Sequence, residues 1–206
     1  MTERRTQAER RAESRLRLIE AAIKLLGSHG YAGTSLVEIG KAAGLSRGLV
    51  SHHFGSKEAC MQAVVATIRE RAAAQLNAVD ARGLAALDRL FEVYFGGVRR
   101  RDANARAMYV ILVEGLTSTP GLRPAVAKTN AITRGHIAEM LRDARAEHDD
   151  VGGDSEVDAT AVLIEGILRG VALQYLADPD VVDLDRTVQL AKVMVRALLL
   201  TGQPAG

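Results

Sequence analysis

The chain has 206 residues, 48% of them hydrophobic, so it can bury a substantial core, and its single cysteine excludes an intrachain disulfide and a cysteine-cluster metal site. It contains no run of about 18 apolar residues and no apolar secretory segment after its arginine-rich start, so we expect no membrane span and a cytoplasmic location. Residues 1–57 contain ten Lys or Arg against five Glu, whereas the remainder has a balance of −3 within the total net charge of +2. The basic end is therefore expected to contact a polyanion.

The first segment, residues 2–17, is polar and arginine-rich, and an apolar pattern at helical spacing follows it as far as a stop at Gly30. The apolar positions are Leu18, Ile19, Ala22, Ile23 and Leu26. We therefore predict a helix that follows a flexible basic arm. The arginines of the arm are either a solvated run of charge or contacts to the minor groove or phosphates of DNA. They are Arg4, Arg5, Arg10 and Arg11.

Helical patterns continue along the whole chain. Ser35 followed by Glu38 is the pattern of a capping box and predicts a short helix from about residue 36 to Ala43. Further helices are predicted from Ser46 to about Phe54, from Ser56 past Ile68, and at about 84–100, 105–118, 122–147, 156–178 and 184–201. Alternating strand patterns and hairpin signals are missing from the sequence, so the predicted fold is all-α with about nine helices.

The two short helices near the N-terminus are spaced as a helix-turn-helix. Gly44 can adopt the positive φ of the turn, and the small residues Gly40 and Ala43 allow the helices to approach closely. The apolar residues available for the corner are Ile39, Leu45 and Val50. Such a unit inserts its second helix into the major groove. We therefore predict a DNA-binding domain at 1–57, with a three-helix core, and a larger helical domain at 58–206.

Several short motifs in this region match those of a known family. They are Gly30 with Thr34-Ser35, Ala43-Gly44-Leu45-Ser46, His53-Phe54 and Ser56-Lys57-Glu58. With them, the segment from Leu18 to Val65 resembles the TetR family of transcriptional regulators. Leu49-Val50-Ser51 stands where many members have Thr-Leu-Tyr and is more similar to the BetI-type branch. Base preferences therefore cannot be transferred from the Tyr-containing relatives.

This resemblance assigns the DNA contacts by position. The residues expected to face the groove are Arg47, Gly48, Leu49, Ser51 and His53, with Ser46 at the start of the same helix and His52 as a backbone contact. Thr34, Ser35 and Lys57 are expected to hold phosphates. Arg47 either reads guanine O6 and N7 through its paired donors or binds phosphate. His52 and His53 point about 100° apart, which disfavours joint chelation of one metal, and we expect neither a metal nor a cofactor.

The resemblance also assigns dimerisation to the last two helices, 156–178 and 184–201. In the family these form a four-helix bundle with their copies in a second chain. Their apolar residues fit this role, and Gly166 and Gly170 would let helices pack closely. The alternative is that both helices are wholly internal core.

Between these parts, members of the family enclose a small-molecule pocket. The candidate lining residues are Phe91, Tyr94, Phe95, Met108, Tyr109, Leu112, Ile132, His136, Met140, Gln174 and Tyr175. Aromatic and methionine residues at helical spacing can equally be core packing. Inward polar groups need partners, and the polar candidates are His136, Asn130, Glu114 and Arg169, which can also bond one another. The low aromatic content, 3%, disfavours a cage for a quaternary ammonium, so we expect an apolar ligand with one or two polar groups.

The sequence therefore predicts a homodimeric, ligand-responsive repressor that a small-molecule effector releases from a palindromic operator. The alternative is an architectural DNA-binding dimer without a small-molecule input. A helical enzyme that uses Glu114 and His136 is disfavoured, because the sequence offers no spacing typical of a nucleophile with its base, no phosphate loop and no metal cluster. Cys60 is expected to be buried filler or, alternatively, a redox sensor.

Overall fold

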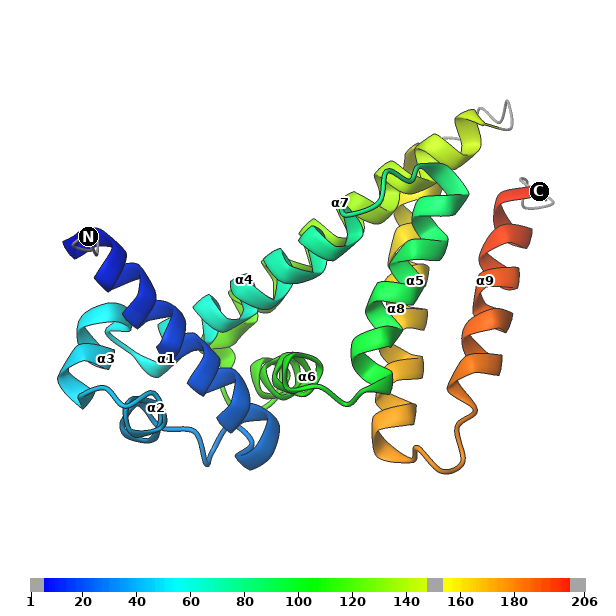
Figure 1. Ribbon diagram of the computed structural model, residues 1–206. Coiled ribbons are helices and arrows are strands. Elements are labelled where there is room, and N and C mark those ends of the chain that lie inside the picture. The colour runs from blue at the N-terminus through cyan, green and yellow to red at the C-terminus, as the bar shows by residue number, and fades with distance from the viewer. Residues whose placement is uncertain (1–5, 148–153, 201–206) are drawn as a thin grey trace, which may run out of the picture. The chain divides into compact units, whose positions relative to one another are not determined.

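The structure, a computed structural model, describes residues 6–147 and 154–200, and within these ranges it is entirely helical (Figure 1). The described residues form nine α-helices and one 3-10 turn. They are α1 (Gln7–His29), α2 (Leu36–Ala42), α3 (Arg47–Phe54), α4 (Lys57–Leu76), α5 (Gly83–Arg99), α6 (Ala103–Leu116), η1 (Pro120–Leu122), α7 (Arg123–Ala146), α8 (Asp154–Ala177) and α9 (Leu184–Leu200). The predicted all-α fold is confirmed, and all predicted helix limits except one agree to within about two residues.

The exception is the start of α1. The helix begins at Gln7, and its first turn is closed by the only complete capping box found at a described helix start, in which Glu9 N–H donates to Thr6 Oγ1 at 3.2 Å and Thr6 N–H donates to Glu9 Oε2 at 2.7 Å. The polar residues that follow are mainly Arg, Glu and Ala, which are strong helix formers. The flexible arm was therefore predicted too long: Arg10 and Arg11 lie on the helix, whereas Arg4 and Arg5 lie outside the described residues.

The chain divides into two compact units that are not continuous segments. Unit 1 comprises Met1–Arg69 and Asp102–Ala127, and unit 2 comprises Glu70–Arg101 and Lys128–Gly206. Helix α6 and the turn η1 thus belong with the helix-turn-helix, while α4 and α7 each contribute to both units. This division follows packing. The division by function at residue 57 is a separate matter and stays a prediction.

The core of unit 1 forms around the apolar face of α1. That face packs along α6, and α2 packs across α3. The residues predicted for it, Leu18, Ile19, Ala22, Ile23 and Leu26, are all at most 2% exposed. They join a single cluster with Ile39, Val50, Met61, Ile111 and Leu122. Full burial of a Leu or Ile side chain contributes about 1.5–3 kcal/mol to the free energy of folding. The buried face of α1 therefore contributes strongly to the stability of this unit.

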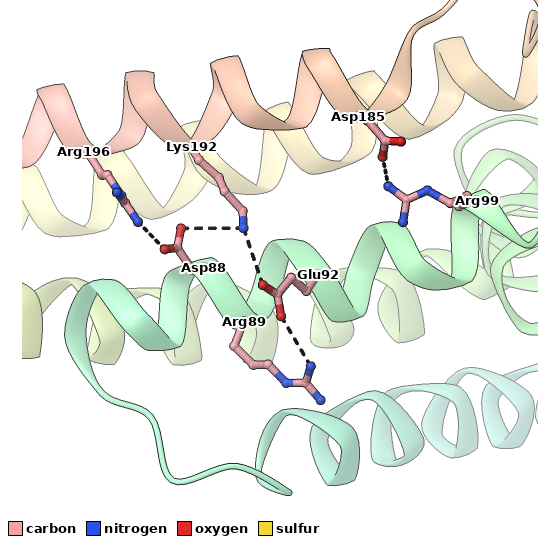
Figure 2. Close-up of polar contacts among 7 residues, drawn as sticks. All are labelled: Asp88, Arg89, Glu92, Arg99, Asp185, Lys192 and Arg196. Atoms are coloured by element: carbon pink, nitrogen blue, oxygen red, sulfur yellow. Dashed lines mark hydrogen bonds and ion pairs between the residues drawn. The ribbon is translucent and has the colours of Figure 1, made fainter.

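In unit 2, ion pairs connect α5 to α9 (Figure 2). The pairs are Asp88 with Arg196, Asp88 with Lys192 at 3.8 Å, Glu92 with Lys192 at 3.8 Å, and Asp185 with Arg99. Most of these groups are partly exposed, so each pair adds little to stability, at most about 1 kcal/mol. Their arrangement along one side of α9 instead fixes which side of that helix faces α5.

Large apolar side chains on another side of α9 and on α8 face solvent in the single chain. They are Val162, Leu163 and Leu173 on α8 and Leu190, Val193, Met194 and Leu198 on α9, each between 41% and 62% exposed. A Cβ at Gly166 or Gly170 would meet nothing within 4 Å, so these glycines do not serve packing inside the chain. Not all of the predicted interface is exposed, because Val188, Ala191, Val195 and Leu199 are core residues of unit 2.

Helix α8 is also long and apolar enough over Ser155–Ala177 to cross a membrane, by length and composition alone. This does not contradict the expectation drawn from the sequence, because α8 contains no continuous run of about 18 apolar residues. The expectation considered continuous apolar runs, whereas in α8 apolar residues outweigh interspersed polar ones. Glu165 and Arg169 in the middle of the helix would be costly in a bilayer, which favours protein contact as the role of its apolar side.

Cys60 lies in the core of unit 1 and is 0% exposed. Burial raises the pKa of its thiol to about 12, so almost none of it is thiolate at pH 8. We expect the native protein to resist 5,5′-dithiobis(2-nitrobenzoate), with labelling that becomes rapid only in denaturant. Labelling of the native protein at the rate of a free thiol would revive the redox-sensor alternative.

Candidate DNA-binding site

The helix-turn-helix corner is built from glycine and backbone hydrogen bonds. Gly44 has φ +63°, the left-handed value predicted for the turn, and Leu45 N–H donates to Gly40 O at 2.8 Å. A Cβ at Gly40 would lie 3.0 Å from both Leu45 O and a methyl carbon of Val50, so α2 and α3 touch where the small residue stands. Ile39 and Val50 are both 0% exposed and fill the corner as predicted.

Helix α3 is short and capped at both ends. Ser46 Oγ accepts from Leu49 N–H at 3.2 Å at the N-terminus, and Gly55 closes the C-terminus with φ +74°. One side of the helix carries the buried Val50, and the opposite side exposes four residues. They are Arg47, Gly48, Ser51 and His52. A Cβ at Gly48 would have no protein atom closer than 3.9 Å, so this side is open to a partner.

The two histidines of α3 have different environments. His52 is exposed on the open side of the helix, whereas His53 is half-buried, and its Nε2 is buried without a hydrogen-bond partner in the described residues. Burial, reinforced by the charges of Arg11, His52 and Arg15, lowers the pKa of His53, so its imidazole is neutral at pH 7. His52 is thus the more exposed of the two, and the groove-facing role of His53 and the backbone contact of His52 stay predictions.

Thr34 and Ser35, both predicted to hold phosphates, have opposite environments. Ser35 is exposed at the start of α2, where its Oγ accepts from Glu38 N–H at 3.1 Å. Thr34 is 0% exposed, and its hydroxyl donates to Gly30 O at 2.7 Å. The hydroxyl proton of Thr34 is therefore used inside the loop, and a phosphate contact by this residue stays a prediction.

Lys57 is also used inside unit 1. Its Nζ donates to Tyr31 O at 2.6 Å and lies 3.7 Å from the centre of the Tyr31 ring. Burial lowers the pKa of this ammonium, while Glu114 and Glu58 partly offset the effect. Lys57 therefore joins the start of α4 to the loop after α1. The predicted phosphate contact of Lys57 stays a prediction.

Sequence reasoning missed two arginines that support the site from α1. Arg17 Nη2 donates to Ala43 O at 2.5 Å, at the end of α2, and Arg15 lies 5.5 Å from the centre of the Phe54 ring at the end of α3. The partners are 26 and 39 residues away in sequence, so no local pattern identifies them. The available signal in the sequence was that these arginines border the apolar face of α1, from which a side chain can reach neighbouring helices.

The candidate ligand residues are distributed over both units. Met108, Tyr109 and Leu112 belong to unit 1, and the others belong to unit 2. Phe91 and Phe95 are each 1% exposed, with ring centres 6.1 Å apart. The side chains of Tyr94, Ile132, Met140 and Tyr175 are half-buried, whereas Gln174 and His136 are exposed. His136 is therefore not an inward polar group as predicted, and a ligand role for the rest stays a prediction.

Comparison with known proteins agrees with this geometry. Residues 18–64 match the family of bacterial regulatory proteins, tetR family, and residues 83–200 match the BetI-type transcriptional repressor, C-terminal. The HTH-type transcriptional regulator UidR of Escherichia coli strain K12 is 26% identical over 179 residues, which are 87% of this chain and 88% of UidR.

Two solved structures share the fold. A TetR-family transcriptional regulator from Rhodococcus sp. superposes with a TM-score of 0.79 at 19% identity, over 91% of this chain and 99% of that one. A complex of SmeT with triclosan superposes with a TM-score of 0.71 at 24% identity, over 90% of each chain.

The capped helix pair, the exposed side of α3 and the helical body together define a helix-turn-helix DNA-binding protein. The chain belongs to the TetR family of transcriptional regulators, with a BetI-type C-terminal region. Members of this family and the relatives found are regulators of transcription, so the chain is a regulator and not an enzyme.

Proposed function

We propose that this protein is a homodimeric repressor that binds a palindromic operator and leaves it when a small-molecule effector binds the helical body. The exposed side of α3, with Arg47 at its N-terminal end and Gly48, Ser51 and His52 beside it, is the observation that carries the DNA-binding part. An N-terminal residue of a recognition helix is where base edges are reached, and a glycine there permits close approach to DNA.

The apolar sides of α8 and α9 support the dimer. Seven large apolar residues are exposed on these two helices, which contact each other, and exposed apolar surface gathered in this way is typical of a protein–protein contact. A second copy of the same helices would bury them in a symmetric four-helix contact, and the open Gly166 and Gly170 would allow close approach there. A twofold dimer reads a palindrome, and we propose that it does so in the cytoplasm.

The effector part of the proposal is supported by the fold. The SmeT structure contains triclosan, so a protein of this fold accommodates a small, largely apolar molecule. A compound that binds the body would stabilise the folded protein in thermal melts, with an effect that grows as the logarithm of its concentration relative to its Kd. The same compound should release operator DNA in a gel shift. Stabilisation without release across a compound library would favour the architectural alternative.

Arg47→Ala is expected to cost about 1–3 kcal/mol of operator affinity and to relax the preference at one base pair. Operator fragments can be selected from random DNA with the wild-type protein, and gel shifts across single-base variants then measure both effects. Arg82→Ala, which removes the same charge from an exposed position in unit 2, should bind as the wild type does. Unchanged affinity and base preference in Arg47→Ala would contradict the role given to this residue.

A further inference from the structure

A row of polar pairs joins α7 to α8 in unit 2. As residue numbers rise along α7 they fall along α8, so the two helices are antiparallel. The pairs are Arg134 with Glu165 at 3.1 Å, Arg142 with Asp158 at 3.8 Å and Arg145 with Glu156 at 3.1 Å. Arg142 and Arg145 each have a carboxylate of their own. The pair at Glu165 differs from them, because a second guanidinium shares its carboxylate.

The side chain of Glu165 is only 7% exposed. Its Oε2 accepts from Arg134 Nη1 at 3.1 Å, and its Oε1 lies 2.8 Å from Arg169 Nη2. This Oε1 is buried and accepts no hydrogen bond of good geometry from the described residues. Arg169 Nη2 donates instead to Asn130 Oδ1 at 2.7 Å. These four residues, Asn130, Arg134, Glu165 and Arg169, are called the α7–α8 cluster below.

The α7–α8 cluster holds more positive charge and more donors than its own residues use. Two guanidiniums provide ten N–H donors, whereas within the described residues they contact one carboxylate and one amide oxygen. A charge that is partly removed from water and unbalanced is unfavourable unless a counter-ion completes it. Arg134 and Arg169 are 36% and 22% exposed, so a solute can reach them.

We infer that the α7–α8 cluster binds a small organic carboxylate that also carries a hydroxyl group. The planar donors of Arg134 and Arg169 match a carboxylate in paired hydrogen bonds. Glu165 Oε1, which makes an ion pair with Arg169 at 2.8 Å, accepts from the hydroxyl and so gains the hydrogen bond that the described residues do not give it. This inference rests on the proposed function, because such a compound would be the effector, and it differs from the sequence-based expectation of an apolar ligand with one or two polar groups.

The test compares three probes with the same number of carbons on the full-length protein at matched ionic strength. Gluconate has a carboxylate and hydroxyls, hexanoate has only the carboxylate, and sorbitol has only hydroxyls. We expect titration calorimetry to show binding of gluconate, binding of hexanoate at least about tenfold weaker, and no binding of sorbitol, because charge-assisted hydrogen bonds dominate such sites. The melting temperature of the protein with each probe at millimolar concentration should follow the same order.

Substitutions distinguish a ligand-binding site from a set of ion pairs that only holds α7 to α8. Arg169→Gln should weaken gluconate binding at least about tenfold. Glu165→Gln removes the competing carboxylate without changing its shape, so hexanoate should bind several-fold more tightly than to the wild type, even if the variant melts at a lower temperature. Arg196→Gln, which removes a guanidinium from the α5–α9 pairs of the same unit, should leave both affinities unchanged.

The inference would be overturned if neither carboxylate binds, or if gluconate binds the wild type and Arg169→Gln with equal affinity. The cluster would then only hold α7 to α8. Gel shifts distinguish this from a failure of the proposed function. If gluconate binds but never releases operator DNA, the site stands and the effector role given to it fails. If only neutral compounds release the DNA, the proposed function stands and this inference fails.

Discussion

Val193→Glu is expected to convert the protein to a monomer and to weaken operator binding by at least about a hundredfold. Val193 is 62% exposed in the apolar side of α9 that we propose as the dimer contact. Twofold symmetry repeats each substitution, so one variant places two carboxylates in the interface. Burial of each without a partner costs several kcal/mol. A monomer then holds one half-site alone and loses most of the affinity.

Size-exclusion chromatography with light scattering, at micromolar protein concentration, measures the molecular mass. A gel shift with a selected operator measures the affinity. Ala85→Glu introduces the same charge at an exposed position of α5 and is the matched control, which should remain a dimer with unchanged affinity. If Val193→Glu still elutes as a dimer, the contact lies elsewhere, and the apolar sides of α8 and α9 need another explanation.

Gly40→Leu should abolish operator binding while the protein remains dimeric. Even a Cβ at this position lies 3.0 Å from the backbone oxygen of Leu45, which cannot move without displacing the turn. Overpacking of this kind costs about 1–3 kcal/mol or more, and here the cost falls on the crossing of α2 and α3. The proposed dimer helices belong to unit 2, so association should be unaffected.

The matched control is Gly135→Leu on α7, where a Cβ would meet nothing within 4 Å. This control should melt and bind DNA like the wild type. Circular dichroism melts, light scattering and gel shifts on the two variants measure stability, association and affinity separately. Operator binding by Gly40→Leu at wild-type strength would mean that the α2–α3 crossing tolerates a bulky side chain and that this close approach is not needed for the DNA-binding geometry.

Most of the helices could be predicted because their limits are set by capping residues close by in the sequence. The side-chain oxygens of the serines at 35, 46 and 56 cap α2, α3 and α4, because each accepts a hydrogen bond from the backbone N–H three residues later. Gly30 and Gly55 end helices with positive φ. The start of α1 was wrong because a run of charged residues was interpreted as an arm, although Arg, Glu and Ala favour helix. Polarity indicates exposure and does not exclude helical structure.

The orientation of individual side chains could be predicted only in part. Position in a family motif placed Arg47, Gly48 and Ser51 on α3, and the structure exposes all three. It did not separate His52 from His53, because which of two neighbours is buried depends on how α1 packs against α3. Lys57 likewise reaches Tyr31 across 26 residues of sequence. Contacts of this range are decided by tertiary packing and leave no periodic signal.

The hydrogen bond from Arg17 to Ala43 O has a consequence for how such regulators diversify. Its acceptor is a main-chain oxygen at the end of α2, so this contact does not depend on the side chains of α3. The outward residues of α3 can therefore be exchanged for others without loss of this support. New target sequences become accessible by a few surface replacements, with the scaffold beneath them left as it is.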